Sequence, residues 1–456
     1  MWVHPIESRY GSERMRSIFR QESRVRRMAE VEALYARALA RRGIIPVEAA
    51  DAIERASKEV TVDDVLEEER LVKHETMALV RALSRRAGRH GEYLHLGLTS
   101  NDVLDTVMGV QIKEAGRLIV SETASLLESI IRRGEESLDV VCLGRTHGVA
   151  ADPIPLSMKF AYWSYLVRSS LRRFISALDE ACVGKLRGAV GTLAASVELG
   201  IQDPLAVESE VLSSLGLRPP EITTQIVPRD RLAFLIVSMS LFSSALDIIA
   251  NEIRNLHRTE IGEIREHFEE SQVGSSTMPH KMNPINSEKV CGLARLMRSL
   301  ALAALENIVL EHERDLTNSS VERVIIPEAF LILEEQISTL TRVIGSLDIE
   351  RDRIEENLRR YADLALSERL MISLVKKGLG RQEAHEIVRR ISLRSKRSGM
   401  RFLDEVMRDE EISRVLTREE MEEIFRPEGY LGLGKELSIK EFEIAKEFLK
   451  EVLSHE

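Results

Sequence analysis

Two series of apolar residues recur with alternating spacings of four and three, and they constrain the fold more than any other feature of the sequence. The first series is Leu235, Met239, Phe242, Leu246, Ile249, Ile253 and Leu256. The second is Phe330, Leu333, Ile337, Leu340, Ile344 and Leu347. Helices that pack side by side have this period. Both series exceed the mean globular helix of about three turns. The sequence therefore predicts an all-α chain with a central bundle of long helices.

The bundle is expected between two regions of different character. Residues 285–312 add a third predicted helix, and strand-like alternation is rare. Residues 1–100 predict shorter helices with charged faces, whereas residues 351–456 are charge-rich and broken by glycine and proline. We predict three domains, at 1–100, 101–350 and 351–456. The apolar faces of the bundle are wide enough to continue into neighbouring subunits.

Composition excludes several classes of partner. The net charge of -10, from 64 basic and 74 acidic residues, argues against general nucleic-acid binding. The apolar run 232–250 is long enough for a membrane span, but it contains Asp247 and four serines and has a helical period. Residues 1–10 lack the apolar core of a signal peptide. The three cysteines are few and odd in number, which predicts reduced thiols. We expect a cytoplasmic protein with neither a nucleic-acid nor a membrane partner.

The segment 271–284 separates two helical regions and is rich in reactive side chains. Its residues 274–284 are Gly-Ser-Ser-Thr-Met-Pro-His-Lys-Met-Asn-Pro. Loops carry chemistry more often than cores do, and a bare connector needs no such set, so a catalytic loop is predicted. Asn283 is suited to cap a helix that starts at Pro284. That helix would point its N–H groups and positive dipole end at the loop, as oxyanion-type stabilisation requires.

Two further polar segments admit a structural and a functional interpretation. Thr99 and Asp102 are spaced as a capping box, which either only starts a helix or also provides an anion site at the helix N-terminus. His147 lies between Thr146 and Gly148 in a predicted tight turn. A lone loop histidine is usually structural. We expect Asp152-Pro153, which follow, to open a helix.

A fourth segment, residues 311–323, is either a charged helix end or a phosphate grip. Its sequence is Glu-His-Glu-Arg-Asp-Leu-Thr-Asn-Ser-Ser-Val-Glu-Arg. Guanidinium forks and serine hydroxyls match phosphate oxygens.

Together these segments resemble the fumarase/aspartase superfamily and, within it, the adenylosuccinate lyases. The matching patterns are GSS-x-MP-H-K-x-NP, GRTHG-x-x-A-x-P and HERD-x-x-x-SS-x-ER, and the resemblance spans nearly the whole chain. It implies a C–N lyase of purine biosynthesis that releases fumarate from adenylosuccinate, giving AMP, and from succinyl-aminoimidazole-carboxamide ribotide. It also implies a homotetramer with sites shared between chains. No metal or other cofactor is implied, since the chain has no zinc-type cluster, GxGxxG or Walker A pattern.

The resemblance also implies roles for individual residues. Ser275 would be the base, Lys281 would neutralise the developing aci-carboxylate, and His147 would be the acid, oriented by Glu288. Lys281 and backbone N–H groups would lower the pKa of the serine in a closed site. The implied substrate contacts are Arg9, Tyr10, Lys73, His74, Glu75, His95, Thr99, Ser100, Thr146, Gln225, Asn283, Arg314, Ser319 and Arg323.

The chain departs from the family pattern at three positions, and two rival interpretations stay open. Met282 stands where the family usually has arginine, Thr277 where alanine is common, and Glu75 where aspartate is common. A carboxymuconate cycloisomerase shares the SS-x-MPHK loop but has no phosphate to hold, so Arg314 and Arg323 argue against it. The other rival is a non-catalytic helical scaffold that has kept the fold.

Overall fold

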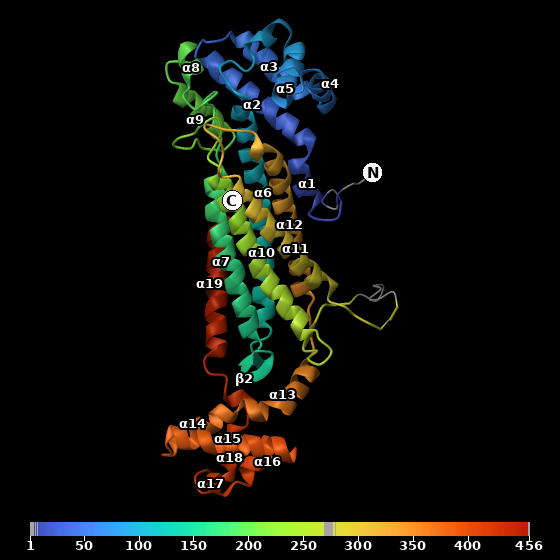
Figure 1. Cartoon of the computed structure of the whole chain (residues 1–456), viewed down its shortest axis with the longest axis vertical. Helices are drawn as coiled ribbons and strands as arrows, with labels where there is room; N and C mark the ends of the chain where they lie inside the picture. The colour runs from blue at the N-terminus through green and yellow to red at the C-terminus, as the bar shows by residue number, and fades with distance from the viewer. Residues whose placement is uncertain (1–3, 5, 7, 269–276, 279, 455–456) are drawn as a thin grey trace. The chain divides into compact units, whose positions relative to one another are not determined.

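Helices dominate the chain, which confirms the all-α prediction. The computed structural model describes residues 4, 6, 8–268, 277–278 and 280–454. The long helices lie between residues 100 and 345, in the region where the bundle was predicted (Figure 1). They are α6 (Ser100–Glu135), α7 (Ser157–Ala181), α10 (Asp230–Leu256), α11 (Ile285–Glu306) and α12 (Thr317–Gly345).

The apolar series lie in the protein interior, as their spacing predicts. Every member of the series on α10 is at most 2% exposed, and every member of the series from Phe330 to Leu347 is at most 3% exposed. On α11, Leu293, Met297, Leu300 and Ala304 form a third apolar stripe, and each is at most 6% exposed. The heptad-like period therefore identified the faces that pack against other helices.

The contacts divide the chain into two compact units. Unit 1 comprises Met1–Thr123, Ser169–Leu246 and Gly292–Ser338, and unit 2 comprises Ala124–Arg168, Asp247–Cys291 and Thr339–Glu456. The five long helices each contribute residues to both units. The predicted domain boundaries near 100 and 350 stay a prediction.

Unit 1 adds a cluster of shorter helices in the first hundred residues. They are α1 (Glu13–Phe19), α2 (Gln21–Arg41), α3 (Val47–Glu59), α4 (Val62–Val72), α5 (Glu75–Ala87) and the 3-10 helix η2 (Gly88–Tyr93), with α8 (Ala194–Glu198) and α9 (Pro204–Ser214) from later in the chain. A capping box of Thr61 and Asp64 starts α4. Leu39, Ile53 and Leu83 are fully buried in the common core. Alanines on α2 and α3 allow these helices to pack closely (Figure 1).

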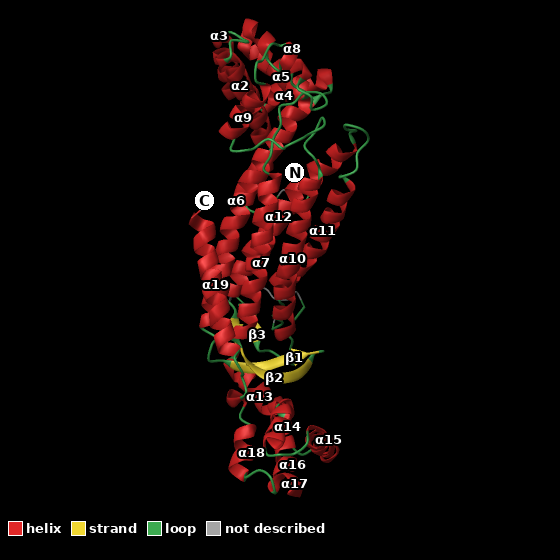
Figure 2. Ribbon diagram, turned by 90° about the vertical axis from the view of Figure 1, so that its left-hand side faces the viewer, coloured by secondary structure: helices red, strands yellow, loops and turns green. Residues whose placement is uncertain are grey.

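Unit 2 contains the strands and the helices of the C-terminal region. Its helices are α13 (Arg351–Ala365), α14 (Ser367–Lys376), α15 (Arg381–Ser398), α16 (Phe402–Met407), α17 (Glu410–Ser413), α18 (Arg418–Ile424), the 3-10 helix η3 (Pro427–Gly429) and α19 (Gly434–Ser454). Strands β1 (Val141–Thr146) and β2 (Val149–Pro155) form an antiparallel hairpin that packs against α13 (Figure 2). Strands β3 (Ile264–Arg265) and β4 (Asp348–Ile349) form a second pair.

Helix α10 is the one described helix that is long and apolar enough to cross a membrane. Its most apolar window has a mean hydropathy of 2.1, and 67% of that window is buried inside the chain. A core helix passes the same test. All three cysteines are described, and each is a free thiol.

Candidate active site

The predicted site residues are distributed over both units. Unit 2 holds Thr146, His147, Lys281, Asn283 and Glu288, and the other described site residues belong to unit 1. The predicted base, Ser275, lies outside the described residues, together with the rest of 271–276. The roles of these residues therefore stay predictions, and the geometry below concerns their described neighbours.

His147 lies in the two-residue turn of the β1–β2 hairpin. Thr146 pairs with Val149, and both turn residues have positive φ, 54° for His147 and 74° for Gly148. Two consecutive left-handed residues are typical of the type I′ turn, which suits the twist of a hairpin. The turn presents the imidazole of His147 to solvent. The predicted tight turn is thus present, and it closes a hairpin.

The expectation that Asp152-Pro153 open a helix is wrong. Both residues lie in strand β2, where Pro153 pairs with Leu143, and α7 begins only at Ser157. Proline is tolerated in this position because each strand of a two-stranded sheet is an edge strand. The proline signal alone did not distinguish a helix start from an edge strand.

An ion pair anchors the hairpin near its turn. The Arg145 guanidinium donates to both carboxylate oxygens of Glu263, at 2.9 Å for Nη1–Oε2 and 2.5 Å for Nη2–Oε1. Glu263 is 2% exposed and also accepts a hydrogen bond from Asn357 at 2.8 Å. Burial lowers the pKa of Arg145, but its bonds to Glu263 outweigh this and leave the pKa raised. A bidentate, buried pair of this kind fixes orientation as well as distance.

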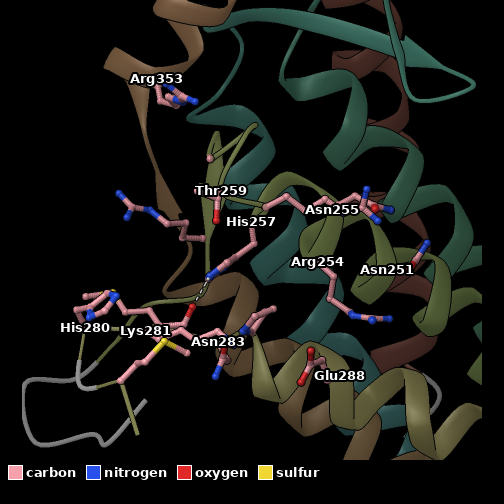
Figure 3. A pocket seen from close by; sticks show the side chains of 16 residues that line it. Asn251, Arg254, Asn255, His257, Thr259, His280, Lys281, Asn283, Glu288 and Arg353 are labelled. Carbon is pink, nitrogen blue, oxygen red and sulfur yellow. Dashed lines mark hydrogen bonds between the residues drawn. The ribbon is translucent and has the colours of Figure 1, made fainter. Parts of the chain in front are cut away.

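A basic cavity of about 870 Å³ in unit 2 contains three of the predicted residues (Figure 3). Lys281, Asn283 and Glu288 line it. The other cationic or imidazole side chains in its lining are Arg254, His257, Arg258, Arg265, His280 and Arg353. Some of these charges are neutralised, since Arg265 pairs with Glu350 and Arg353 with Glu356. A cavity with this excess of positive charge suits an anionic ligand such as a dicarboxylate.

The start of helix α11 differs from the prediction. Helix α11 begins at Ile285, and the carboxylate of Glu266 binds the next two N–H groups, with 3.2 Å to the nitrogen of Asn286 and 2.6 Å to that of Ser287. The side chains of Asn286 and Ser287 donate to the same carboxylate at 3.1 and 2.5 Å. These two backbone N–H groups are therefore not available to an oxyanion in the loop. The positive end of the helix dipole stabilises a negative charge at this position.

A smaller cavity of about 280 Å³, in unit 1, is lined by residues of the predicted phosphate-binding segment 311–323. Glu75, Arg314, Ser319 and Arg323 line it. The Arg323 Nη2 lies 3.0 Å from Glu75 Oε2, and Arg24 Nε lies 2.6 Å from Glu75 Oε1. Burial raises the pKa of Glu75, but the two arginines outweigh this and hold it below its usual value. Glu75 therefore already accepts a hydrogen bond from one nitrogen of the Arg323 guanidinium, which is predicted to bind a phosphate.

Arg314 is held by two amides. Its Nη1 donates to Asn101 Oδ1 at 2.8 Å and to Gln225 Oε1 at 3.1 Å. Burial lowers the pKa of Arg314, and the nearby cation of Arg229 adds to this against the opposing charge of Asp105. Amide acceptors orient the guanidinium without neutralising its charge, so Arg314 remains able to attract an anion.

Lys73, His74, Thr99 and Ser100, which were also predicted, lie at or just before the starts of α5 and α6. The imidazole of His74 caps α5 and lies 3.4 Å from Ser100 Oγ. The Thr99 N–H donates to the buried Asp102 at 2.8 Å, which is one half of the predicted capping box. Asp102 also pairs with the buried Lys185, so its carboxylate has a structural role. Arg9, Tyr10 and Lys73 line neither cavity.

His95 is in a strained conformation and paired with a buried acid. Its φ is 60°, and its Nδ1 lies 2.6 Å from Glu32 Oε1. Burial lowers the pKa of His95, but the bond to Glu32 outweighs this, so the pKa is raised. A non-glycine residue held at positive φ points to a side chain whose position is fixed by its surroundings.

Several lining residues had not been predicted from the sequence. Arg254, His257 and Arg258 occupy the end of α10 and the residues after it, and Arg24 and Asn101 line the smaller cavity. Arg254, His257 and Arg258 could have been noticed in the sequence, because the apolar series ends at Leu256 and these basic residues surround its end. No three His, Cys, Asp or Glu side chains of the described part of the chain are grouped so as to hold a metal ion.

The comparisons with known proteins cover nearly the whole chain. A family model described as Lyase matches residues 8–297, and one described as Adenylosuccinate lyase C-terminus matches residues 363–437. An adenylosuccinate lyase of Pyrococcus horikoshii is 44% identical over 449 residues, covering 98% of this chain and 99% of the relative. The chain belongs to the adenylosuccinate lyase family.

Solved structures of the wider lyase superfamily share the fold. A fumarate lyase from Mesorhizobium sp. BNC1 aligns with a TM-score of 0.88 at 27% identity, over 97% of this chain and 99% of that chain. A 3-carboxy-cis,cis-muconate lactonizing enzyme from Pseudomonas putida aligns with a TM-score of 0.87 at 26% identity, over the same shares of the two chains. The fold is therefore common to several activities, and membership of the family depends on the sequence.

Proposed function

We propose that this protein cleaves adenylosuccinate to AMP and fumarate, and succinyl-aminoimidazole-carboxamide ribotide to the corresponding carboxamide ribotide and fumarate. The likeness to adenylosuccinate lyases over the whole chain supports this proposal. The observation that carries it is the cavity lined by Arg314, Ser319 and Arg323, because a nucleotide substrate has a phosphate to bind and a muconate has none.

The proposed reaction is a β-elimination. Ser275 removes a proton from the carbon beside a succinyl carboxylate, and that carboxylate becomes a doubly charged aci-carboxylate. Lys281, which lines the basic cavity, neutralises this charge. The electron pair then forms the carbon–carbon double bond of fumarate and the C–N bond breaks. The leaving nitrogen takes its proton from His147, with Glu288 orienting that imidazole.

We propose assembly as a homotetramer with shared sites. On α10, Phe234, Leu241 and Ile248 are spaced by seven and are 44%, 53% and 45% exposed in the single chain. They form an apolar stripe separate from the buried series on the same helix. A repeated stripe of large apolar residues favours packing against another helix.

The proposed cellular location and partners rest on the charge and the composition of the chain. A cytoplasmic location, small-molecule nucleotide substrates and no nucleic-acid partner agree with the net charge of -10 and the free thiols. The proposed chemistry uses only side chains of the protein and requires no metal or other cofactor.

The direct test is to add adenylosuccinate to the purified protein and follow the absorbance of the fumarate produced. Release of fumarate and AMP in equal amounts supports the proposal. 3-Carboxymuconate is the substrate that tests the alternative activity, that of a carboxymuconate cycloisomerase. The likeness to the Pseudomonas putida enzyme favours this alternative. Turnover of the muconate alone would establish the cycloisomerase instead. Turnover of neither compound by folded protein would favour the non-catalytic scaffold.

A further inference from the structure

The short segment that follows α10 and includes β3 contacts several parts of the candidate site in unit 2. We call residues 257–266 the corner segment. Its Glu263 holds Arg145 in the hairpin that carries His147. Its Glu266 binds the start of α11, the helix that carries Glu288. Its first residue, His257, contacts the chain between Lys281 and Asn283.

His257 has two backbone partners and belongs to no predicted set. Its Nε2 lies 3.0 Å from the carbonyl oxygen of Met282. A dashed line marks the hydrogen bond of His257 in Figure 3. Its Nδ1 lies 3.3 Å from the backbone nitrogen of Glu266. The side chain is half-buried and lines the basic cavity.

The two contacts fix the tautomer of His257. The backbone N–H of Glu266 can only donate, so Nδ1 is the acceptor and carries no proton. A neutral imidazole then has its proton on Nε2, which donates to the Met282 carbonyl. Both ring nitrogens are used, and the imidazole bridges the corner segment and the segment 281–283.

Glu266 and His257 fix adjacent parts of the same stretch of chain. Glu266 binds the backbone at Asn286 and Ser287, and His257 binds it at Met282, four residues earlier. The intervening residues Asn283, Pro284 and Ile285 are therefore held from both sides. Lys281 is joined directly to the residue that His257 binds, and Lys281 also lines the cavity.

We propose that His257 is a positioning residue for the elimination, and that its imidazole holds Lys281 and Asn283 in place for the carboxylate end of the substrate. The proposal rests on the proposed function. His257 acts through the backbone of Met282 and has no direct contact with the reacting atoms. A cation displaced by about 1 Å at a site of charge development can cost on the order of a hundredfold in rate.

Three variants test this role. His257→Ala removes both contacts. His257→Gln places an amide N–H near the position of Nε2 and can still donate to the Met282 carbonyl. His267→Ala is the matched control, since it removes a nearby imidazole that contacts Asp348 at 3.3 Å and has no described contact with residues 280–288. Each is measured for kcat, KM and the affinity of AMP.

We expect kcat of His257→Ala to fall by at least about tenfold, with KM and the affinity of AMP changed by less than about twofold. His257→Gln should recover to within about threefold of the unaltered protein, and His267→Ala should match it. Normal kcat in His257→Ala would overturn the proposal. Equal damage in His257→Ala and His257→Gln, or a loss shared by His267→Ala, would overturn it as well, because the effect would then be a general one.

Hydrogen exchange separates failure of this proposal from failure of the proposed function. Without substrate, a peptide spanning residues 277–288 should exchange faster in His257→Ala than in His267→Ala or in the unaltered protein. If the unaltered protein releases no fumarate, the proposed function fails and this measurement still decides whether His257 holds the segment. Unchanged exchange in His257→Ala would refute the positioning role by itself.

Discussion

Replacing Asp105 with asparagine should destabilise the protein strongly, because Asp105 is the buried partner of Arg229. Asp105 accepts hydrogen bonds from both terminal nitrogens of Arg229 at 2.9 Å and from the Val227 N–H at 2.7 Å. Arg229 is 5% exposed and also donates to Glu322 at 2.8 Å. Asp105→Asn keeps the shape of the side chain and removes its charge.

The structure sets the size of the effect. If the new amide NH₂ takes the place of Oδ1, it faces the Arg229 Nη2 donor and one of the three hydrogen bonds is lost. Arg229 keeps Glu322, so the cost lies at the lower end of the range for breaking a buried pair, about 3 kcal/mol. At about 2–4 °C per kcal/mol for a unit of this size, Tm should fall by about 6–12 °C.

The assay is thermal unfolding followed by circular dichroism, with Asp139→Asn as the matched control. Asp139 makes the same kind of contact, 2.6 Å to Lys435, but is 90% exposed. Its replacement should leave Tm unchanged within error, because exposed ion pairs contribute little. Equal shifts in the two variants would refute the reasoning from burial.

The pH dependence provides a second check. Burial raises the pKa of Asp105, but the charge and hydrogen bonds of Arg229 outweigh this, so the folded pKa lies below the usual value. A depressed carboxyl pKa contributes stability that is present above the unfolded value of about 3.9 and is lost as pH falls through the folded value. The gap in Tm between the unaltered protein and Asp105→Asn should therefore be full at pH 6–8 and narrow below about pH 4. A gap that stays constant down to pH 3 would show that charge is not its cause.

Three other predictions concern the proposed chemistry. Ser275→Ala should lower turnover by at least about a thousandfold while calorimetric substrate affinity is retained, and near-normal turnover would exclude Ser275 as the base. Arg323→Ala should weaken AMP binding by about tenfold or more and fumarate binding hardly at all, whereas equal losses for both ligands would show a structural role. Ser275→Ala and His147→Ala, each inactive alone, should regain activity when unfolded and refolded together, with about a quarter of sites intact. Mixed tetramers that stay inactive would show that one chain supplies both residues.

The long helices and the chemical residue types could be predicted from the sequence because both are local properties. A series such as Leu235 to Leu256 repeats its signal over several turns, so the buried face is specified many times. The segments around His147, Lys281 and Arg314 carry unusual residues at fixed spacings, and a spacing can be compared with a family pattern. Membership of the family follows from that comparison over the whole chain.

Tertiary structure alone decided which partners these residues have. Glu266 binds the start of α11 from 20 residues away, Glu75 reaches Arg323 across 248 residues, and Arg145 reaches Glu263 across 118. Each is a single contact between charged or polar groups that has no period along the chain. The hairpin at His147 was missed for a related reason, since its strands are short and a proline there suits a helix start and an edge strand equally. A repeated apolar period is recorded in the sequence many times, whereas the partner of one carboxylate is determined only when the packed helices bring distant segments within hydrogen-bonding distance.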